Sequence, residues 1–269
     1  MMQESQYLME SNEESHRLDI KINSALIEKQ ALWAGIQPGM RVADMGCGPG
    51  RITSILSHLV QPLGSVVGVD GSPQRLDYAA SHYGREGIEF VQRDITKPLH
   101  DLGGFDFIWV RFVLEYYLSK SFEIVKNISE CLEPGGILCL MDLDHNPLNY
   151  YGTSDRLDRT FRKIISELQG KIDFDPYAGK KLYSFLYDLG YEDIDVEVSI
   201  HKVIFGQIDD LDSFNMMKKI EVAPQKISFQ YDEYEGGYEE FYKEAQSFFS
   251  DKRRFTYTPL ISCRGKKPS

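Results

Sequence analysis

Short apolar runs alternate with segments of helical periodicity along the first half of the chain. Each run has the length of a buried strand, and the runs cover residues 40–45, 65–70, 88–91, 105–110 and 137–143. Between them, apolar residues recur at spacings of three and four, as in Ile52, Ile55, Leu56 and Leu59, and a helix is expected over residues 119–132. Strands that alternate with helices predict an α/β fold with a largely parallel sheet.

The two ends of the chain have patterns of their own. A helix is predicted over residues 13–36, with Leu18, Ile22, Leu26, Ala31 and Trp33 on its buried side. Later helices are predicted around residues 157–168, 182–189, 211–220 and 238–249, and a half-exposed strand over residues 194–201. A last strand is expected over residues 258–264. Pro259 lacks the N–H that a central strand needs, so either pairing begins at Leu260 or the register differs.

The first strand ends in a turn with three glycines at every second position. Gly46, Gly48 and Gly50 connect the strand to a helix, which is the geometry that brings backbone N–H groups against a ligand. A dinucleotide fingerprint would need its third glycine where Arg51 stands, and Asp44 would repel a pyrophosphate. A nicotinamide-dependent oxidoreductase is therefore disfavoured, whereas a small cationic ligand is compatible with Asp44.

Acidic residues follow at the ends of later strands. Asp70 comes about twenty positions after the glycine turn, where a carboxylate can accept both hydroxyls of a ribose. Ser72 then reads as a helix N-cap, with Pro73 at the first helical position and an apolar stripe at Leu76, Ala79, Ala80 and Tyr83. Asp94 follows the third strand in the same way.

Together these features resemble the class I S-adenosylmethionine (SAM)-dependent methyltransferases. The resemblance covers about residues 40–144 and rests on Asp44-x-Gly46-x-Gly48-x-Gly50, on Asp70 and Asp94, and on the phrase Leu-Glu-Pro-Gly-Gly at 132–136. It implies a doubly wound seven-stranded sheet, mostly parallel, with helices on both faces. The last strand would be antiparallel and inserted between the fifth and sixth.

The resemblance also implies where SAM binds. The glycines would shape the methionine side, Asp70 would take the ribose, and Asp94 with Ile95 would take the adenine. Arg111 and Phe112 would line the cleft through their backbone. The expected cofactor residues are Asp44, Gly46, Cys47, Gly48, Gly50, Asp70, Gly71, Ser72, Asp94, Ile95, Arg111 and Phe112. In related enzymes an N-terminal segment covers the cofactor, so Tyr7 and Arg17 are further candidates, Arg17 pairing with the cofactor's carboxylate.

We expect one domain over residues 1–269. It would comprise an N-terminal helical flap (1–36), a SAM-binding core (37–145), a helical lid insertion (146–190) and C-terminal strands with accessory helices (191–269). The insertion is rich in aromatic residues, most of which are expected to be core and some to form an apolar substrate pocket: Tyr150, Tyr151, Phe161, Phe174, Tyr177, Tyr183 and Phe185.

Methyl transfer needs few protein groups, because SAM already supplies an activated methyl. A base is required when the acceptor is a neutral alcohol, phenol or acidic carbon. His145 is the first candidate by position and ordinary pKa, with the carboxylates of Asp142, Asp144 and Glu115 as rivals. No His, Asp or Glu group has metal-ligand spacing, so a metal-independent enzyme is expected.

Composition limits the classes of partner that the protein is expected to bind. A net charge of −11 argues against a nucleic-acid-binding surface, and no apolar run is long enough for a membrane span. Cys47, Cys131, Cys139 and Cys263 lack metal spacing and are expected to be reduced, in a cytoplasmic protein. The expected function is methylation of a small molecule at O, N or C. A non-catalytic SAM-binding protein, aminopropyl transfer and a homodimeric state are left open.

Overall fold

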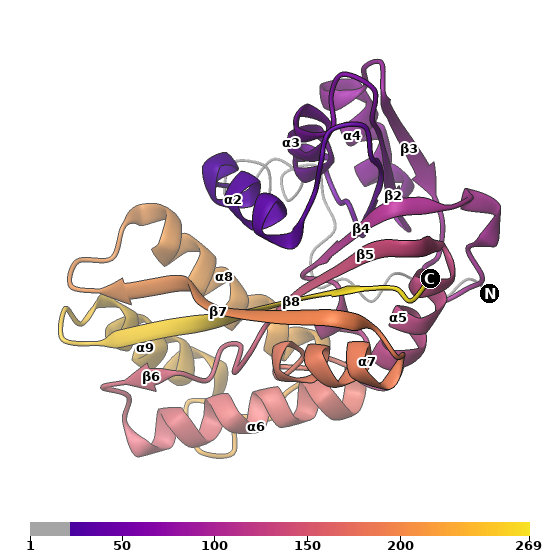
Figure 1. Ribbon diagram of the computed structural model, residues 1–269. Helices are drawn as coiled ribbons and strands as arrows, with labels where there is room; N and C mark the ends of the chain where they lie inside the picture. Colours follow the sequence, from indigo (N-terminus) through magenta and orange to yellow (C-terminus); the bar gives the residue numbers. More distant parts are fainter. Residues whose placement is uncertain (1–21) are drawn as a thin grey trace.

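One twisted sheet organises the computed structural model, which describes residues 22–269 (Figure 1). Its strand order is β3-β2-β1-β4-β5-β8-β6, and β7 pairs with β8. The strands are β1 (Arg41–Met45), β2 (Ser65–Asp70), β3 (Ile88–Gln92), β4 (Phe105–Arg111), β5 (Leu132–Leu143), β6 (Tyr150–Tyr151), β7 (Glu192–Phe205) and β8 (Phe255–Lys266).

The sheet confirms the expected topology. Strands β3, β2, β1, β4 and β5 are parallel, whereas β8 runs antiparallel between β5 and β7. The only addition to the seven expected strands, within the described residues, is the two-residue strand β6. The fold is therefore the mostly parallel α/β sheet with an antiparallel last strand that the sequence indicates.

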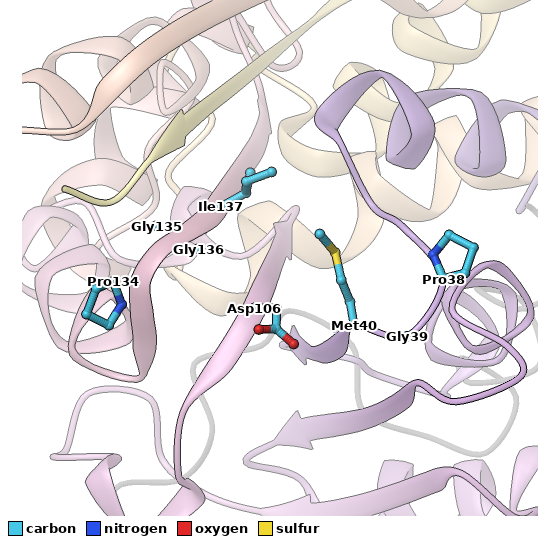
Figure 2. A pocket seen from close by; sticks show the side chains of 8 residues that line it. All are labelled: Pro38, Gly39, Met40, Asp106, Pro134, Gly135, Gly136 and Ile137. Carbon is cyan, nitrogen blue, oxygen red and sulfur yellow. The ribbon is translucent and has the colours of Figure 1, made fainter. Parts of the chain in front are cut away.

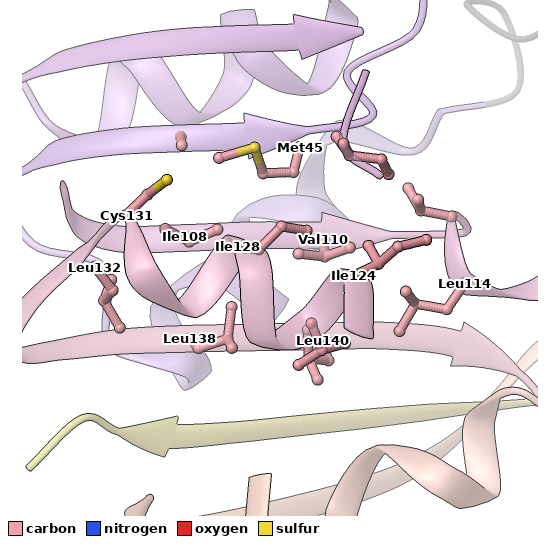
Figure 3. Close-up of a cluster of buried hydrophobic side chains, with 14 of the residues drawn as sticks. Met45, Ile108, Val110, Leu114, Ile124, Ile128, Cys131, Leu132, Leu138 and Leu140 are labelled. Atoms are coloured by element: carbon pink, nitrogen blue, oxygen red, sulfur yellow. The ribbon is translucent and has the colours of Figure 1, made fainter. Parts of the chain in front are cut away.

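Helices cover both faces of the sheet. They are α2 (Ser24–Ala34), α3 (Arg51–Leu59), α4 (Pro73–Tyr83), α5 (Ser121–Glu130), α6 (Asp155–Ile172), α7 (Leu182–Asp188), α8 (Asp210–Lys226) and α9 (Gly237–Ser250), with 3-10 turns η1 (His100–Leu102), η2 (Leu114–Tyr116) and η3 (Gly179–Lys181). Alternate strand residues point to opposite faces. In β4, for example, Ile108 packs with α5 and α7, whereas Trp109 packs with α2 and α3. Figure 3 shows the first of these clusters, around Ile124 and Ile128 of α5.

Local sequence signals set several helix ends. Ser72 caps α4 by accepting from the backbone N–H of Arg75 at 3.4 Å, and Pro73 opens the helix, as predicted. Ala80 is exposed, however, because only Leu76 and Ala79 face the sheet deeply enough to be buried. In α2 the expected Leu26 is likewise exposed, and Ile27 takes the buried place.

The junction between α5 and β5 differs from the expectation. The helix ends at Glu130 and the strand already begins at Leu132, which pairs with Phe105. A register shift follows before Ile137 pairs with Phe107. The Pro134-Gly135-Gly136 segment, which lies before the strand expected from Ile137, is thus an irregular part of that strand.

The C-terminal region has a core of its own. Helices α6, α8 and α9 enclose a cluster that includes Phe161, Phe174, Phe241 and Phe249. Of the aromatic residues predicted as core or pocket, Phe161 and Phe174 are buried, whereas Tyr151 and Tyr183 are exposed. The stripe expected on α8 is only partly inward, since Leu211 and Phe214 remain exposed. We call α6, α8, α9, β6 and the outer halves of β7 and β8 (residues 198–205 and 255–259) the C-terminal wing.

The insertion between β5 and β7 divides between the two cores. Helix α6 packs in the wing, but Leu182 and Leu186 of α7 are buried in the same cluster as β4, β5 and α5. Helix α7 thus supports the sheet. In residues 22–269 no helix is both long and apolar enough to cross a membrane.

Strand β8 resolves the question raised by Pro259. Its pairing with β5 begins at Leu260, opposite Leu143. This is the first of the two alternatives given for Pro259. Pro259 itself lies opposite Ile200 of β7, and the β7 register shifts between Ile200 and Lys202. His201 is consequently the extra residue of a β-bulge, a feature that redirects a side chain.

Candidate cofactor site

The glycine turn lies at the carboxyl end of β1, where ligands bind in open α/β sheets. Gly46, Gly48 and Gly50 all have positive φ values, at +78°, +54° and +86°. A side chain at Gly46 would come within 2.4 Å of Val113 Cγ2, and one at Gly50 within 2.6 Å of Ala79 Cβ. At Gly48 a Cβ would meet nothing within 4 Å. The turn is thus closed on its inner side and open at its centre, where a ligand can approach.

Asp70 connects the turn to β2. Its carboxylate accepts from the N–H of Gly48 at 2.9 Å and from the N–H of Ser72 at 2.9 Å, and Arg75 Nη1 is 3.9 Å away. Each oxygen keeps a second lone pair, so the carboxylate can still accept hydroxyl donors. The turn is also fixed by the N–H groups of Gly46 and Cys47, which both donate to Val69 O. The structure thus places Asp70 beside the glycine turn, as the sequence predicts.

Asp94 and Ile95 follow β3 on the same edge. Asp94 is exposed, and its Oδ1 accepts from the N–H and hydroxyl of Thr96 at 2.9 and 2.7 Å. Ile95 is buried, with its carbonyl held by Asn127 at 2.9 Å. Tyr117, just after η2, was missed by the sequence analysis. Burial, and then the charges of Asp94 and Asp70, raise the pKa of the Tyr117 hydroxyl, which therefore lies near both acids.

Asp44 is a buried acid beneath the turn. Its Oδ2 accepts from Thr53 Oγ1 at 2.6 Å, and it is 3% exposed. Burial raises its pKa to about 7, an effect that the Thr53 hydrogen bond opposes and the charge of Asp70 reinforces. A cationic ligand near this carboxyl would favour its ionised form.

Arg111 and Phe112 contribute more than backbone. The Phe112 N–H donates to Met141 O within the sheet, so it does not point into the cleft. The Arg111 guanidinium lies 3.8 Å from the Phe112 ring centroid, and burial lowers its pKa to about 10 although Asp142 and Asp44 counteract that shift. Phe112 has a φ of +58°, unusual for a bulky residue and typical of functional positions.

His201 meets this group from the wing. Its ring packs edge-on against Phe112, with centroids 4.9 Å apart and an interplanar angle of 74°. The sequence analysis assigned His201 no role, because its strand reads as half-exposed. The signal that could have located the bulge is Pro259, whose missing N–H lies beside His201, which remains an exposed residue.

The four candidate bases, Asp142, Asp144, Glu115 and His145, differ in accessibility. Asp142 is fully buried and accepts from the N–H groups of Leu114, Glu115 and Leu143, at 2.9, 3.2 and 2.8 Å. Burial and the charge of Glu115 raise its pKa well above the ordinary value. Both features make Asp142 a structural anchor for η2.

Glu115 is also enclosed, since it is 5% exposed and accepts from Asn146 Nδ2 at 2.8 Å. Burial raises its pKa as well. His145 is open by comparison. Its side chain is 44% exposed, Nδ1 lies 3.0 Å from Asp144 Oδ2, and its ring meets Tyr177 edge-on at 5.1 Å. A histidine oriented by a carboxylate has the arrangement of a general base.

Other features of the molecule do not add to this site. Tyr7 and Arg17 lie outside the described residues. The four cysteines are free and buried, and burial raises the pKa of Cys47 well above its usual value. Among residues 22–269 no group of three or more His, Cys, Asp or Glu side chains could hold a metal ion.

A hollow of about 400 Å³ lies at the opposite end of the sheet (Figure 2). It is bordered by Met40, Asp106, Pro134 and Ile137, at the amino ends of β1 and β4 and near the start of β5. Asp106 Oδ2 accepts a hydrogen bond from the backbone N–H of Arg41 at 2.8 Å. Since the glycine turn and its acids are at the carboxyl ends, this hollow is not the cofactor site.

The fold and the glycine turn define a Rossmann-like protein that binds a nucleoside-containing cofactor. Comparison with known proteins makes this specific, since residues 43–140 match the family described as the methyltransferase domain. Residues 43–140 are therefore similar to a methyltransferase domain of the class I SAM-dependent type.

Two curated relatives illustrate the similarity. The chain is 26% identical over 182 residues to juvenile hormone acid O-methyltransferase of Bombyx mori, covering 65% of this chain and 63% of that one. It is 30% identical over 166 residues to demethylmenaquinone methyltransferase of Lactococcus lactis, covering 56% and 63%. The aligned region thus spans less than two thirds of either relative.

Solved structures agree on the fold. A methyltransferase-like protein of Bacillus halodurans superposes with a TM-score of 0.58 at 17% identity, covering 91% of this chain and all of that one. Phosphoethanolamine N-methyltransferase 2 of Haemonchus contortus, solved with SAM, gives 0.52 at 15% identity, covering 91% and 53%. At these identities the likeness concerns the fold alone.

Proposed function

We propose that this protein transfers a methyl group from SAM to a small-molecule acceptor. The observation that carries the proposal is the open centre of the glycine turn, where Gly48 has free space and donates to Asp70. Arg51, at the position of the third dinucleotide glycine, and the buried Asp44 disfavour a nicotinamide cofactor. SAM differs from such a cofactor in carrying a positive charge at sulfur.

Each part of SAM has proposed contacts in this site. Asp70 is free to accept the ribose hydroxyls, and Ile95 and Tyr117 offer apolar surface for the adenine beside Asp94. Asp44 supplies negative charge beneath the turn in its ionised form, which a cationic ligand favours. When bound, SAM supplies the activated methyl, so the protein has to orient the acceptor, exclude water and accept a proton.

His145 is the proposed base. Asp144 holds its Nδ1 at 3.0 Å, which leaves Nε2 available, and nearly half of its side chain is accessible. Asp142 and Glu115 are less suitable, because their carboxylates are buried and already hydrogen-bonded. We propose that Phe112 and His201 form the wall that orients the acceptor.

The substrate class is proposed from the relatives and the composition. One relative is named for O-methylation and another for demethylmenaquinone, and both names refer to small molecules. The charge of −11 is unfavourable for nucleic acid. We further propose a metal-independent reaction, a single domain that includes the flap at residues 1–36 with Tyr7 and Arg17, and a cytoplasmic location.

The charge of the cofactor gives a specific test. Calorimetry should detect binding of SAM and of S-adenosylhomocysteine but not of NAD. Because Asp44 has a pKa of about 7, affinity for the cationic SAM should rise between about pH 6 and 8, whereas affinity for the uncharged product should change less. Binding of NAD in preference to SAM would overturn the proposal.

A second test concerns catalysis. Once an acceptor is found in a panel of acids, phenols, amines and acidic carbons, His145→Ala should lower kcat by about 10²- to 10⁴-fold, the range for a positioned base. SAM affinity should be unchanged, and His58→Ala, at an exposed site on α3, should be neutral. Tight SAM binding without turnover of any acceptor would favour a non-catalytic SAM-binding protein.

A further inference from the structure

The wing exposes large apolar side chains on one face of its strands. Six of them are between 38% and 67% exposed: Val198, Ile200, Val203, Phe205, Phe255 and Tyr257. Residues that pair across two strands share a face. Val203 pairs with Tyr257 and Phe205 with Phe255, and the bulge at His201 keeps Val198 and Ile200 on that same side. We call this surface the β7–β8 face.

The other face of the same strands is covered. Ile204 and Thr256, which pair with each other, are buried, and Lys202 makes an ion pair with Asp212 of α8 at 2.6 Å. His201 packs against Phe112. In Figure 1, α8 and α9 lie behind the outer halves of β7 and β8, whose near side carries no helix. In the outer halves of β7 and β8, apolar side chains are therefore exposed on one face, whereas helices cover the other.

The β7–β8 face is also unprotected at its edge. Among the described residues β7 pairs only with β8, so it is an edge strand of 14 residues. Edge strands are usually guarded by charged residues. The acidic residues of β7 lie in its first half, from Glu192 to Glu197, and its second half carries only Lys202, which is engaged with Asp212.

The exposed area is large for a monomer. Six side chains at these exposures present on the order of 500 Å², at the upper end of the largest apolar patch on a typical monomer. A stable interface buries about 800 Å² on each partner, so this face supplies most of what a dimer needs. The six side chains carry no charge, which matters because two chains of −11 repel each other over most of their surfaces.

We propose that a second copy of this chain packs against the β7–β8 face to form a two-fold dimer. In such an interface the same patch serves both copies, and an uncharged apolar patch is self-complementary. The interface would include Ile200, which neighbours His201, so each copy would stabilise the bulge that holds His201 against Phe112. The proposal does not depend on which acceptor is methylated.

The test is the mass of the protein in solution. Light scattering after size exclusion should give twice the chain mass for the wild type and the single mass for Val198→Lys with Phe205→Lys. Leu32→Lys with Leu63→Lys introduces the same charges at exposed apolar residues on α2 and before β2, and should remain dimeric. SAM affinity serves as the folding control for all three proteins.

A second measurement avoids mutations. Hydrogen exchange of wild-type residues 198–205 should slow as the protein concentration rises, since dimerisation protects this edge. A single-chain mass for the wild type at every concentration would overturn the proposal, as would a double variant that stays dimeric. Sedimentation of a monomeric wild type with lipid vesicles would assign the face to a membrane surface and would also overturn it.

Discussion

The sheet core and the C-terminal wing solve the same packing problem with different residues. In the core, strands β1, β2, β4 and β5 are buried on both faces by mainly aliphatic side chains, and charged groups stand at or after the carboxyl ends of the parallel strands. The wing is held by aromatic rings between three helices and leaves one sheet face exposed. Our proposals accordingly assign cofactor recognition to the core, and acceptor orientation and association to the wing.

The largest expected effect comes from removing the central ring of the wing. Phe241 is fully buried and contacts the rings of Phe161, Tyr231 and Tyr234. Phe241→Ala should lower the free energy of unfolding of the wing by about 3–5 kcal/mol. If the two regions are separable, calorimetry should still detect SAM binding. Leu211→Ala, at an exposed site of α8, is the control, and loss of SAM binding would contradict the division.

The buried acid of the core gives the next largest effect. Asp44 has a pKa of about 7 when folded and about 3.8 when unfolded. Between these values the folded protein keeps a proton that the unfolded chain has lost, so stability falls as pH rises. Relative to Asp44→Asn, the wild type should lose up to about 4 kcal/mol between pH 4 and pH 7. Urea unfolding at several pH values measures this, and parallel profiles would contradict it.

A smaller effect is expected at the ribose position. Asp70→Ala removes the acceptor for Gly48 and Ser72 and should weaken SAM binding by about 1–3 kcal/mol. Calorimetry on the folded variant checks this. Asp77→Ala, an exposed acid on the adjoining helix α4, should bind SAM as the wild type does. Unchanged affinity for Asp70→Ala would remove this residue from the proposed site.

The smallest effect tests how the wing reaches the core. His201→Ala loses one edge-on ring contact with Phe112, a kind of contact that contributes about 0.5–1.5 kcal/mol. We expect KM for the acceptor to rise by a few-fold while SAM affinity and kcat stay near wild type. His201→Phe preserves the ring contact and should restore KM. A fall in kcat without a change in KM would assign His201 to the chemistry instead.

Features that depend on neighbouring residues could be predicted from the sequence. The bounds of β2, the Ser72 cap and the antiparallel last strand follow from local patterns and from the family resemblance. The proximity of the glycine turn and Asp70 could also be predicted, because strand ends in a parallel sheet meet at one edge.

Features set by distant contacts could not be predicted. Asp142 looks like a candidate base in sequence, but the turn after β4 places the N–H groups of Leu114 and Glu115 against its carboxylate. His201 is exposed in the structure as its pattern indicates, but its ring contact with Phe112 depends on a bulge that the pattern does not predict. No sequence pattern singles out Tyr117, whose hydroxyl is influenced by the charges of Asp70 at the end of β2 and Asp94 after β3. Each depends on long-range placement, which periodicity does not encode.

Strand β8 changes its neighbours at a single residue. From Leu260 onwards it is clamped between β5 and β7, whereas before Pro259 it is bonded to β7 and the short β6. The β7–β8 pair therefore runs from the core sheet into the C-terminal wing. Ile200 and His201 lie at this change of neighbours, and the His201 ring contacts Phe112, so this point joins the wing to the residue that follows β4.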